Sequence, residues 1–134
     1  MENYILAIDQ STTTTKAIIF DKRSNVVGRY DVSHKQIYPQ KGWVEHDPKE
    51  IYQNIVEAIR RVIEATGVST DDIAALAVTN QRETTMLWTP DGEPVYNAIV
   101  WQCTRAEGIT RRPEIDSERI YITKSSGLQL SPYF

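Results

Sequence analysis

A long amphipathic helix followed by an apolar strand constrains this fold more than any other part of the sequence. Asp47 before Pro48 is a typical helix start, and apolar residues then recur at helical spacing until Gly67, a typical helix stop. The apolar run 73–78 follows and predicts a buried strand. A helix that crosses between two strands of one sheet makes those strands parallel. We therefore expect an α/β fold.

Three strands joined by short turns are predicted in the N-terminal part. Residues 4–8 form a continuous apolar run, which is typical of a strand covered on both faces. Strand-forming residues return at 16–20 and at 26–32. We expect an antiparallel three-strand meander, with the strand at 73–78 as a parallel neighbour of the first strand.

Shorter elements are predicted in the remaining segments. Residues 36–46 lack periodicity and indicate an ordered loop. The turn residues at 89–92 predict a hairpin between the flanking apolar segments, and 98–101 is a further short apolar strand. Any helix that begins near residue 104 is limited by Pro113, and residues 120–126 fit either helix or coil.

Composition excludes several classes of function. The 134 residues suffice for one domain with its own core, and the net charge of −3 lacks the basic surplus of nucleic-acid-binding proteins. The single cysteine, Cys103, excludes an internal disulfide framework and has no evident activating neighbour in the sequence. The sequence has neither an apolar stretch of membrane-spanning length nor a signal-peptide pattern at its start. We expect a cytoplasmic protein that binds neither nucleic acid nor membranes.

The polar run that follows the strand at 73–78 is the first candidate binding site. Arg82 and Glu83 place a forked donor beside an acceptor, which suits a small molecule with neighbouring hydroxyls. Open α/β sheets bind ligands at the ends of such strands. The alternative is a solvated surface turn.

A second polar run follows the first predicted strand. Asp9 is a candidate for holding Mg²⁺ through water, or it caps the turn that begins at Ser11. The hydroxyls and backbone N–H groups of residues 11–15 could cradle a phosphate, although threonine is also common in strands. If the strands are parallel, this run and the Arg82–Glu83 pair emerge at the same edge of the sheet.

Aromatic residues are the remaining candidates. Trp43, Trp101 and Tyr133 could pack on the carbon face of a polyol, or they could belong to the core. The two histidines, His34 and His46, lack the spacing of a metal site and receive no role.

Four segments match the motifs of a known family in the same order along the chain: 8–14, 42–48, 78–85 and 96–103. They resemble the glycerol kinases of the FGGY carbohydrate kinase family. The resemblance implies a ribonuclease-H-like, actin/hexokinase-type ATPase fold. It also implies ATP-dependent phosphorylation of glycerol to glycerol 3-phosphate, with Mg²⁺ as the metal and glycerol and ATP as the small-molecule partners.

The same resemblance assigns roles to nine residues. Asp9 would help hold the magnesium. Hydroxyl and ammonium groups would contact the nucleotide phosphates: Thr12, Thr13, Thr14 and Lys16. A second set would bind glycerol through its hydroxyls and its carbon chain: Arg82, Glu83, Trp101 and Tyr133.

The chain departs from the family pattern at two positions and in its length. Ser11 stands where glycine is usual, and Lys16 stands where arginine is commoner. The family's catalytic base lies beyond Phe134, and its adenosine site lies in a second lobe. We expect a single domain, the N-terminal part of the first lobe, without turnover of its own.

Three other interpretations remain open. The chain could be a half-enzyme that a separate C-terminal chain completes. It could belong to a kinase for another small polyol or sugar of the family. It could also be a non-catalytic binding module, in which exposed strand edges and apolar surface would favour a homo-oligomer.

Overall fold

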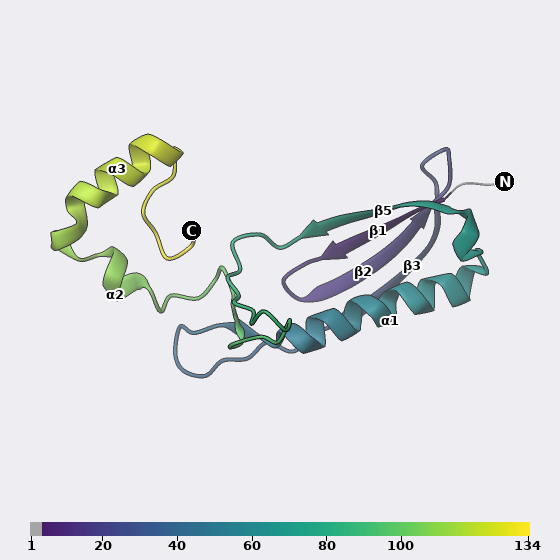
Figure 1. The fold of residues 1–134 in the computed structure, drawn as a ribbon, viewed down its shortest axis with the longest axis horizontal. Helices are drawn as coiled ribbons and strands as arrows, with labels where there is room; N and C mark the ends of the chain where they lie inside the picture. The colour runs from purple at the N-terminus through teal and green to yellow at the C-terminus, as the bar shows by residue number, and fades with distance from the viewer. Residues whose placement is uncertain (1–3) are drawn as a thin grey trace. The chain divides into compact units, whose positions relative to one another are not determined.

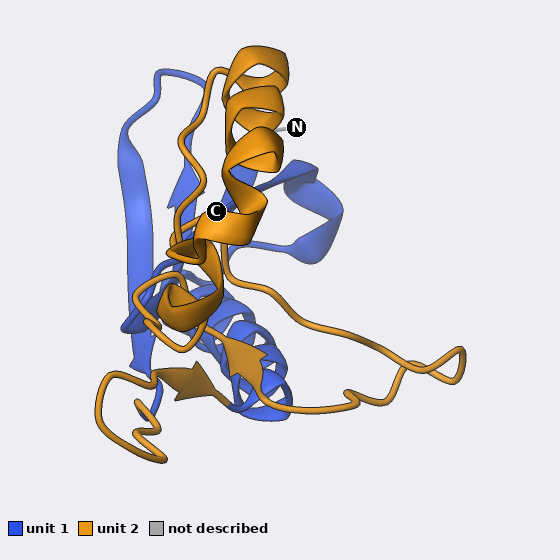
Figure 2. Ribbon diagram, turned by 90° about the vertical axis from the view of Figure 1, so that its left-hand side faces the viewer, with its two compact units in different colours: residues 1–35, 47–81 blue, residues 36–46, 82–134 orange. Residues whose placement is uncertain are grey.

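The structure, a computed structural model, describes residues 4–134, and the chain divides into two compact units (Figure 2). Unit 1 consists of residues 1–35 and 47–81. Unit 2 consists of residues 36–46 and 82–134. Each unit is described separately below.

Unit 1 is built on a mixed four-stranded sheet with the order β3-β2-β1-β5 (Figure 1). Its strands are β1 (Tyr4–Gln10), β2 (Thr14–Phe20), β3 (Val26–Ser33) and β5 (Ile73–Asn80). β1 pairs antiparallel with β2, and β2 pairs antiparallel with β3, whereas β1 and β5 are parallel. The predicted meander with one parallel neighbour is confirmed.

The predicted crossover helix is α1 (Pro48–Thr66), and both of its predicted ends are confirmed. At its start, the Asp47 carboxylate accepts a hydrogen bond from the backbone N–H of Lys49 at 2.8 Å. At its end, Gly67 adopts φ 66°, a left-handed conformation that glycine reaches without strain. The short 3₁₀ helix η1 (Thr70–Asp72) then leads into β5.

The core of unit 1 lies between the sheet and α1, which packs mainly on β2 and β3. Apolar side chains from β1, β2 and α1 fill it: Leu6, Ile8, Ala17, Ile19, Ala58 and Val62. The period-2 pattern of the strands and the 3.6-residue pattern of the helix therefore meet at one interface.

Two expectations about burial are wrong. In β1 only alternate residues are buried, and Ile5 on the other face is 46% exposed. In β5, Leu76 and Val78 are 60% and 66% exposed, although the strand was expected to be buried. The reason is that α1 covers one face of the sheet at β2 and β3 and does not extend over β5.

Unit 2 contains little regular structure. Its two-stranded sheet pairs β4 (Glu45–His46) antiparallel with β6 (Ala98–Ile99). Three short helices follow: α2 (Glu107–Thr110), the 3₁₀ helix η2 (Pro113–Ile115) and α3 (Asp116–Ser126). Pro113 limits α2 as predicted and opens η2, and the stretch that fitted either helix or coil is helical.

The hairpin predicted around 89–92 forms, but the strand predicted at 98–101 is shorter than expected. The Gly92 N–H donates to the Thr89 carbonyl at 2.9 Å, and the flanks of the turn are joined by the Trp88–Pro94 bridge and by a hydrogen bond from the Val95 N–H to the Leu87 carbonyl at 2.9 Å. The strand expected at 98–101 stops after two residues. A turn closed by the Cys103 N–H and the Val100 carbonyl, at 2.8 Å, ends the pairing there. Among the helices at residues 4–134, none combines the length and apolar character needed to cross a bilayer.

Candidate functional site

The carboxyl ends of β1 and β5 lie side by side in unit 1. The parallel register places Asp9 opposite Thr79 and Gln10 opposite Asn80. Just beyond, the Gln81 side-chain amide donates to the Gln10 amide oxygen at 3.3 Å. The polar run that begins at Asp9 and the start of the run that leads to Arg82 therefore share one edge of the sheet. Open α/β sheets bind ligands at such an edge.

The hairpin between β1 and β2 holds the three threonines at its tip. The Ser11 N–H donates to the Thr14 carbonyl at 2.9 Å and closes the loop. His34, which is buried, donates from its ring Nε2 to the Thr12 carbonyl at 2.8 Å and from its backbone N–H to the Thr13 carbonyl at 3.2 Å. Because both carbonyls accept hydrogen bonds from His34, the tip has a defined conformation, while Thr13 remains exposed.

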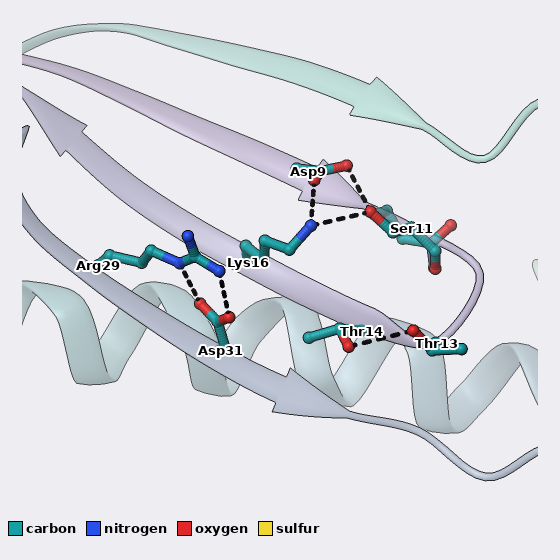
Figure 3. Close-up of polar contacts among 8 residues, drawn as sticks. Asp9, Ser11, Thr13, Thr14, Lys16, Arg29 and Asp31 are labelled. Atoms are coloured by element: carbon teal, nitrogen blue, oxygen red, sulfur yellow. Dashed lines mark hydrogen bonds and ion pairs between the residues drawn. The ribbon is translucent and has the colours of Figure 1, made fainter.

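Asp9, Ser11 and Lys16 form a compact polar cluster beside this tip (Figure 3). Lys16 Nζ donates to Asp9 Oδ2 at 2.6 Å and to Ser11 Oγ at 3.2 Å, and Ser11 Oγ donates to Asp9 Oδ1 at 2.8 Å. The hydrogen bond from Lys16 lowers the pKa of Asp9, and this effect outweighs the opposite effect of burial. Asp9 is therefore an ionised carboxylate whose two oxygens already accept hydrogen bonds.

A second ion pair lies on the next strand, β3. Arg29 donates to Asp31 through two nitrogens, at 2.7 and 2.6 Å, and Asp31 is the register partner of Lys16. The charge of Arg29 also contributes to lowering the pKa of Asp9. Two cations, Lys16 and Arg29, and two carboxylates, Asp9 and Asp31, therefore alternate on neighbouring strands, and each cation is paired with a carboxylate.

The residues around Asp9 fit a hydrated Mg²⁺ ion rather than a closed metal cage. Within residues 4–134, no three His, Cys, Asp or Glu side chains gather as a metal-binding group. Mg²⁺ usually keeps several waters and binds one or two carboxylates together with substrate phosphates. The Asp9 side chain is 34% exposed, so it can accept a further hydrogen bond from a metal-bound water.

Arg82 and Glu83, which follow β5, belong to unit 2 and have an unusual backbone. Both have positive φ values, 52° and 55°, which residues other than glycine seldom adopt. The Thr84 N–H donates to the Arg82 carbonyl at 2.7 Å and tightens the bend. Both side chains are exposed. Strained backbone of this kind persists only where the surrounding structure maintains it, and in proteins generally it clusters at active sites and ligand-binding segments.

The structure brings together two of the three candidate aromatics. The rings of Trp101 and Tyr133 are 5.3 Å apart in an edge-to-face arrangement, at an interplanar angle of 68°. Trp43 is used differently, because the Arg105 guanidinium lies over its ring at 3.9 Å. Trp101 and Tyr133 therefore remain candidates for a carbon-chain contact, and Trp43 supports a side chain of its own unit.

A buried carboxylate that received no role in the sequence analysis organises this part of unit 2. Glu45, whose side chain is only 1% exposed, forms an ion pair with Arg105. It also accepts hydrogen bonds from the Asn97 amide at 2.8 Å and from the Tyr96 hydroxyl at 3.2 Å. Burial raises the pKa of Glu45, but these hydrogen bonds and the Arg105 charge outweigh it, so the pKa lies below its usual value.

The expectation that Cys103 lacks an activating neighbour is wrong. Arg105 Nε donates to the Cys103 sulfur at 2.9 Å. Burial raises the pKa of the thiol, but the hydrogen bonds, that of Arg105 first among them, lower it below its usual value. Cys103 remains buried, so it acts as a packed member of the Glu45 cluster.

A comparison with protein families decides the relationship. The N-terminal domain of the FGGY family of carbohydrate kinases matches residues 4–134. The chain belongs to this family. The four motif segments of the sequence analysis and the mixed α/β sheet of unit 1 agree with that assignment.

Several FGGY relatives are glycerol kinases by name. The chain is 52% identical to glycerol kinase 1 of Thermotoga maritima over 132 residues and 48% identical to the glycerol kinase of Clostridium beijerinckii over 136 residues. These matches cover 98% and 100% of this chain but 27% of each relative. The chain therefore spans about a quarter of the length of the curated relatives it matches.

Solved structures give the same fold. The glycerol kinase of Plasmodium falciparum, crystallised with ADP, matches 99% of this chain and 27% of its own at a TM-score of 0.85 and 35% identity. The gluconate kinase of Lactobacillus acidophilus matches 99% of this chain and 26% of its own at a TM-score of 0.90 and 24% identity. The FGGY kinase fold, with its actin- and hexokinase-like sheet, is therefore confirmed.

Two residues that support the candidate site, His34 and Glu45, received no role from the sequence. They were not assigned because their partners, the Thr12 carbonyl and the Asn97 amide, lie 22 and 52 residues away in sequence. The apolar neighbour Val44 is the only local hint that Glu45 is buried, and it does not identify the partner of the carboxylate.

Proposed function

We propose that this chain is the N-terminal part of a glycerol kinase, which transfers the γ-phosphoryl group of ATP to glycerol and forms glycerol 3-phosphate. The observation that carries the proposal is the shared edge of β1 and β5. There, a hydroxyl-rich hairpin with an ionised Asp9 adjoins the polar run that leads to Arg82 and Glu83. The names of the relatives, at 52% and 48% identity, favour glycerol over other polyols.

The phosphate end of the reaction would lie in unit 1. Thr12, Thr13 and Thr14 supply hydroxyls at a tip whose carbonyls are fixed by His34. Lys16 supplies a positive charge beside them and can turn from Asp9 towards an arriving phosphate oxygen. Bound Mg²⁺ would neutralise phosphate charge, and Asp9 would hold it through water, as its ionised and partly exposed carboxylate allows.

The polyol end of the reaction would use residues of unit 2. Arg82 can donate to two neighbouring hydroxyl oxygens, and Glu83 can accept from a hydroxyl, so the pair can recognise a 1,2-diol. Trp101 offers an aromatic edge for the carbon chain, and the Tyr133 hydroxyl offers one further polar contact. Phosphoryl transfer depends on such positioning and on charge neutralisation more than on covalent chemistry by the protein.

The residues of this chain position substrates, but none of them is proposed as the base that takes the proton of the attacking glycerol hydroxyl. The resemblance to glycerol kinases implies that this base lies in the part of the relatives that these 134 residues do not span. An active site that lacks part of its substrate-positioning residues loses most of its reaction rate, because orientation of the reactants supplies a large part of the barrier reduction. We therefore expect that the 134-residue chain alone does not phosphorylate glycerol.

A chimaera tests the proposal. Residues 1–134 replace the matching segment of T. maritima glycerol kinase 1, and glycerol-dependent ADP formation is measured in the chimaera, in the parent enzyme and in the isolated chain. We expect activity in the chimaera and none in the isolated chain. Asp9→Asn should lower kcat about 10- to 100-fold, as loss of an outer-shell metal partner does, while the exposed turn variant Asp91→Asn should not.

Other outcomes separate the alternatives. If the folded chimaera phosphorylates another polyol better than glycerol, the substrate assignment is wrong but the kinase assignment holds. If Arg82→Ala fails to raise the KM for glycerol about tenfold or more, Arg82 does not bind the substrate. A folded chimaera without any kinase activity, beside an active parent, overturns the proposal in favour of a binding module.

A further inference from the structure

The segments 42–48 and 96–103 are two of the four that resemble the family, yet only Trp101 in them has a role in the proposed function. In the structure they form one cluster around the buried Glu45. We propose that Glu45 is the positioning residue for the turn that carries Trp101, and that it thereby controls how tightly the carbon chain of the substrate is gripped. This inference rests on the proposed function, because it gives that role to Trp101.

Both arms of the Trp101 turn are attached to the same short segment. Before the turn, β6 pairs with β4, and the Val100 N–H donates to the Val44 carbonyl at 3.1 Å. After the turn, the Thr104 N–H and hydroxyl both donate to the Gly42 carbonyl, at 2.8 and 2.9 Å. The position of Trp101 therefore depends on what holds the two arms against residues 42–46.

Glu45 joins the two arms through its carboxylate. One oxygen accepts from Asn97 and the other from Tyr96, both in the arm before the turn. Arg105, in the arm after the turn, pairs with the same carboxylate. Each donor missing from a buried charge carries a free-energy cost, because part of the charge is then left unsatisfied. The full set of three donors therefore favours one arrangement of the two arms.

Arg105 extends this fixation to the residues on either side. Its guanidinium lies over the Trp43 ring at 3.9 Å and donates to the Cys103 sulfur at 2.9 Å. Trp101 itself is only partly buried and contacts Tyr133 edge-to-face. The contacts of Glu45 and Arg105 thus fix the turn from which the Trp101 side chain projects. Misplacement of such a group by about 1 Å is enough to weaken its contribution strongly.

The decisive variant is Glu45→Gln, which keeps the size of the side chain. It removes the charge that faces Arg105 and sets an amide NH₂ against the donor of Asn97. The reciprocal pair Glu45→Gln with Asn97→Asp restores a donor opposite an acceptor and returns a carboxylate to the cluster. Glu114→Gln, at an exposed glutamate, is the matched control. Asn97→Ala is the milder variant, which removes one donor and leaves the ion pair intact.

Two independent measurements, enzyme kinetics and ¹⁹F NMR, report on the position of Trp101. In the chimaera described above, Glu45→Gln should raise the KM for glycerol about tenfold, change the KM for ATP less than twofold, and be partly rescued by Asn97→Asp. In the 134-residue chain labelled with 5-fluorotryptophan, the ¹⁹F resonance of Trp101 should shift or broaden in Glu45→Gln. The resonance of Trp88, which precedes the turn at 89–92, should stay in place.

The outcomes keep this inference apart from the proposed function. An inactive chimaera counts against the proposed function, while the Trp101 resonance still decides whether Glu45 positions the turn. An unmoved Trp101 resonance together with an unchanged KM for glycerol overturns the inference. Equal rises in both KM values would also overturn it, because they indicate general loss of structure. If Glu45→Gln does not fold, Asn97→Ala must give the same KM split with a smaller effect, or the inference fails.

Discussion

Unit 1 and unit 2 hold their candidate site residues by different means. In unit 1, Asp9 and Lys16 project from paired strands whose positions are fixed by backbone ladders over an apolar core. In unit 2, Trp101 lies in a turn that is held by a two-residue ladder and by the side-chain contacts of Glu45. Backbone ladders tolerate most side-chain changes, whereas a buried carboxylate depends on the identity of each partner.

This difference implies that the two units respond to different substitutions. Unit 1 should be sensitive to the volume of its core residues and tolerant of changes on its polar face. Unit 2 should be sensitive to single polar atoms. Four substitutions test this contrast.

Glu45→Ala should have the largest effect and should act on unit 2. Removing the carboxylate leaves the Arg105 guanidinium, only 16% exposed, without its charged partner, which costs about 3–5 kcal/mol. Hydrogen exchange at the Ile99 and Cys103 amides reports on it, because both amides donate in unit 2. Glu114→Ala is the control. Equal loss of protection at the strands of unit 1 would show that the two units unfold together.

Ile19→Ala should destabilise unit 1 by about 2–5 kcal/mol. The Ile19 side chain is fully buried against α1, so its truncation leaves a cavity in the core. Unfolding in urea, followed by far-ultraviolet circular dichroism, measures the change. The neighbouring Ile18→Ala, on the half-buried opposite face of β2, is the matched control and should cost clearly less. Similar losses for both would mean that the far face of the sheet is also covered in solution.

Gly28→Ala should destabilise unit 1 by about 1–3 kcal/mol through overpacking. A Cβ at Gly28 would lie 2.2 Å from the Thr66 methyl carbon at the end of α1. Thr66→Ser removes that methyl and keeps the hydrogen bond from the hydroxyl to the Val62 carbonyl, so it should rescue Gly28→Ala. Gly108→Ala, where the new Cβ meets nothing within 4 Å, should be neutral or slightly stabilising. Thermal denaturation of the wild type, Gly28→Ala, the double variant with Thr66→Ser, and Gly108→Ala measures these differences in stability.

Lys16→Met should have the smallest effect, below about 1 kcal/mol, because the pair with Asp9 is partly exposed. The size of the effect depends on pH. The folded-state pKa of Asp9 is lowered, so the pair stabilises fully above the unfolded value of 3.8 and is lost as the pH falls through the folded value. The difference between wild type and Lys16→Met should therefore shrink below pH 4. A difference that persists in acid would indicate packing of the lysine stem rather than charge.

Much of unit 1 was predictable from the sequence. Asp47 and Gly67 gave the ends of α1, because capping is decided by neighbouring residues. The meander followed from short connections, and the parallel pairing of β5 with β1 followed from the crossover helix. The exposure of Leu76 and Val78 was not predictable, because an apolar run shows that a strand can be buried and not whether a helix reaches it.

The candidate site was predictable only in part. Asp9, Arg82 and Glu83 were found because they follow apolar strands, and that pattern is local. Their roles, like those of the other candidate residues, remain proposals. The supports of the site, His34 and Glu45, were missed because their partners are a distant backbone carbonyl and a distant amide.

The fold class, the helix ends and the family follow from the sequence alone, since periodicity, capping and motif order are properties of residues close together in the chain. The covered face of each strand becomes known only in the folded structure, as does the buried carboxylate that the segments 42–48 and 96–103 share. Burial and hydrogen-bond partnership depend on which distant residues meet, and a hydrogen bond forms only within about 3 Å. Glu45 illustrates the difference: its position in the sequence is unremarkable, and its function depends on Asn97 and Arg105.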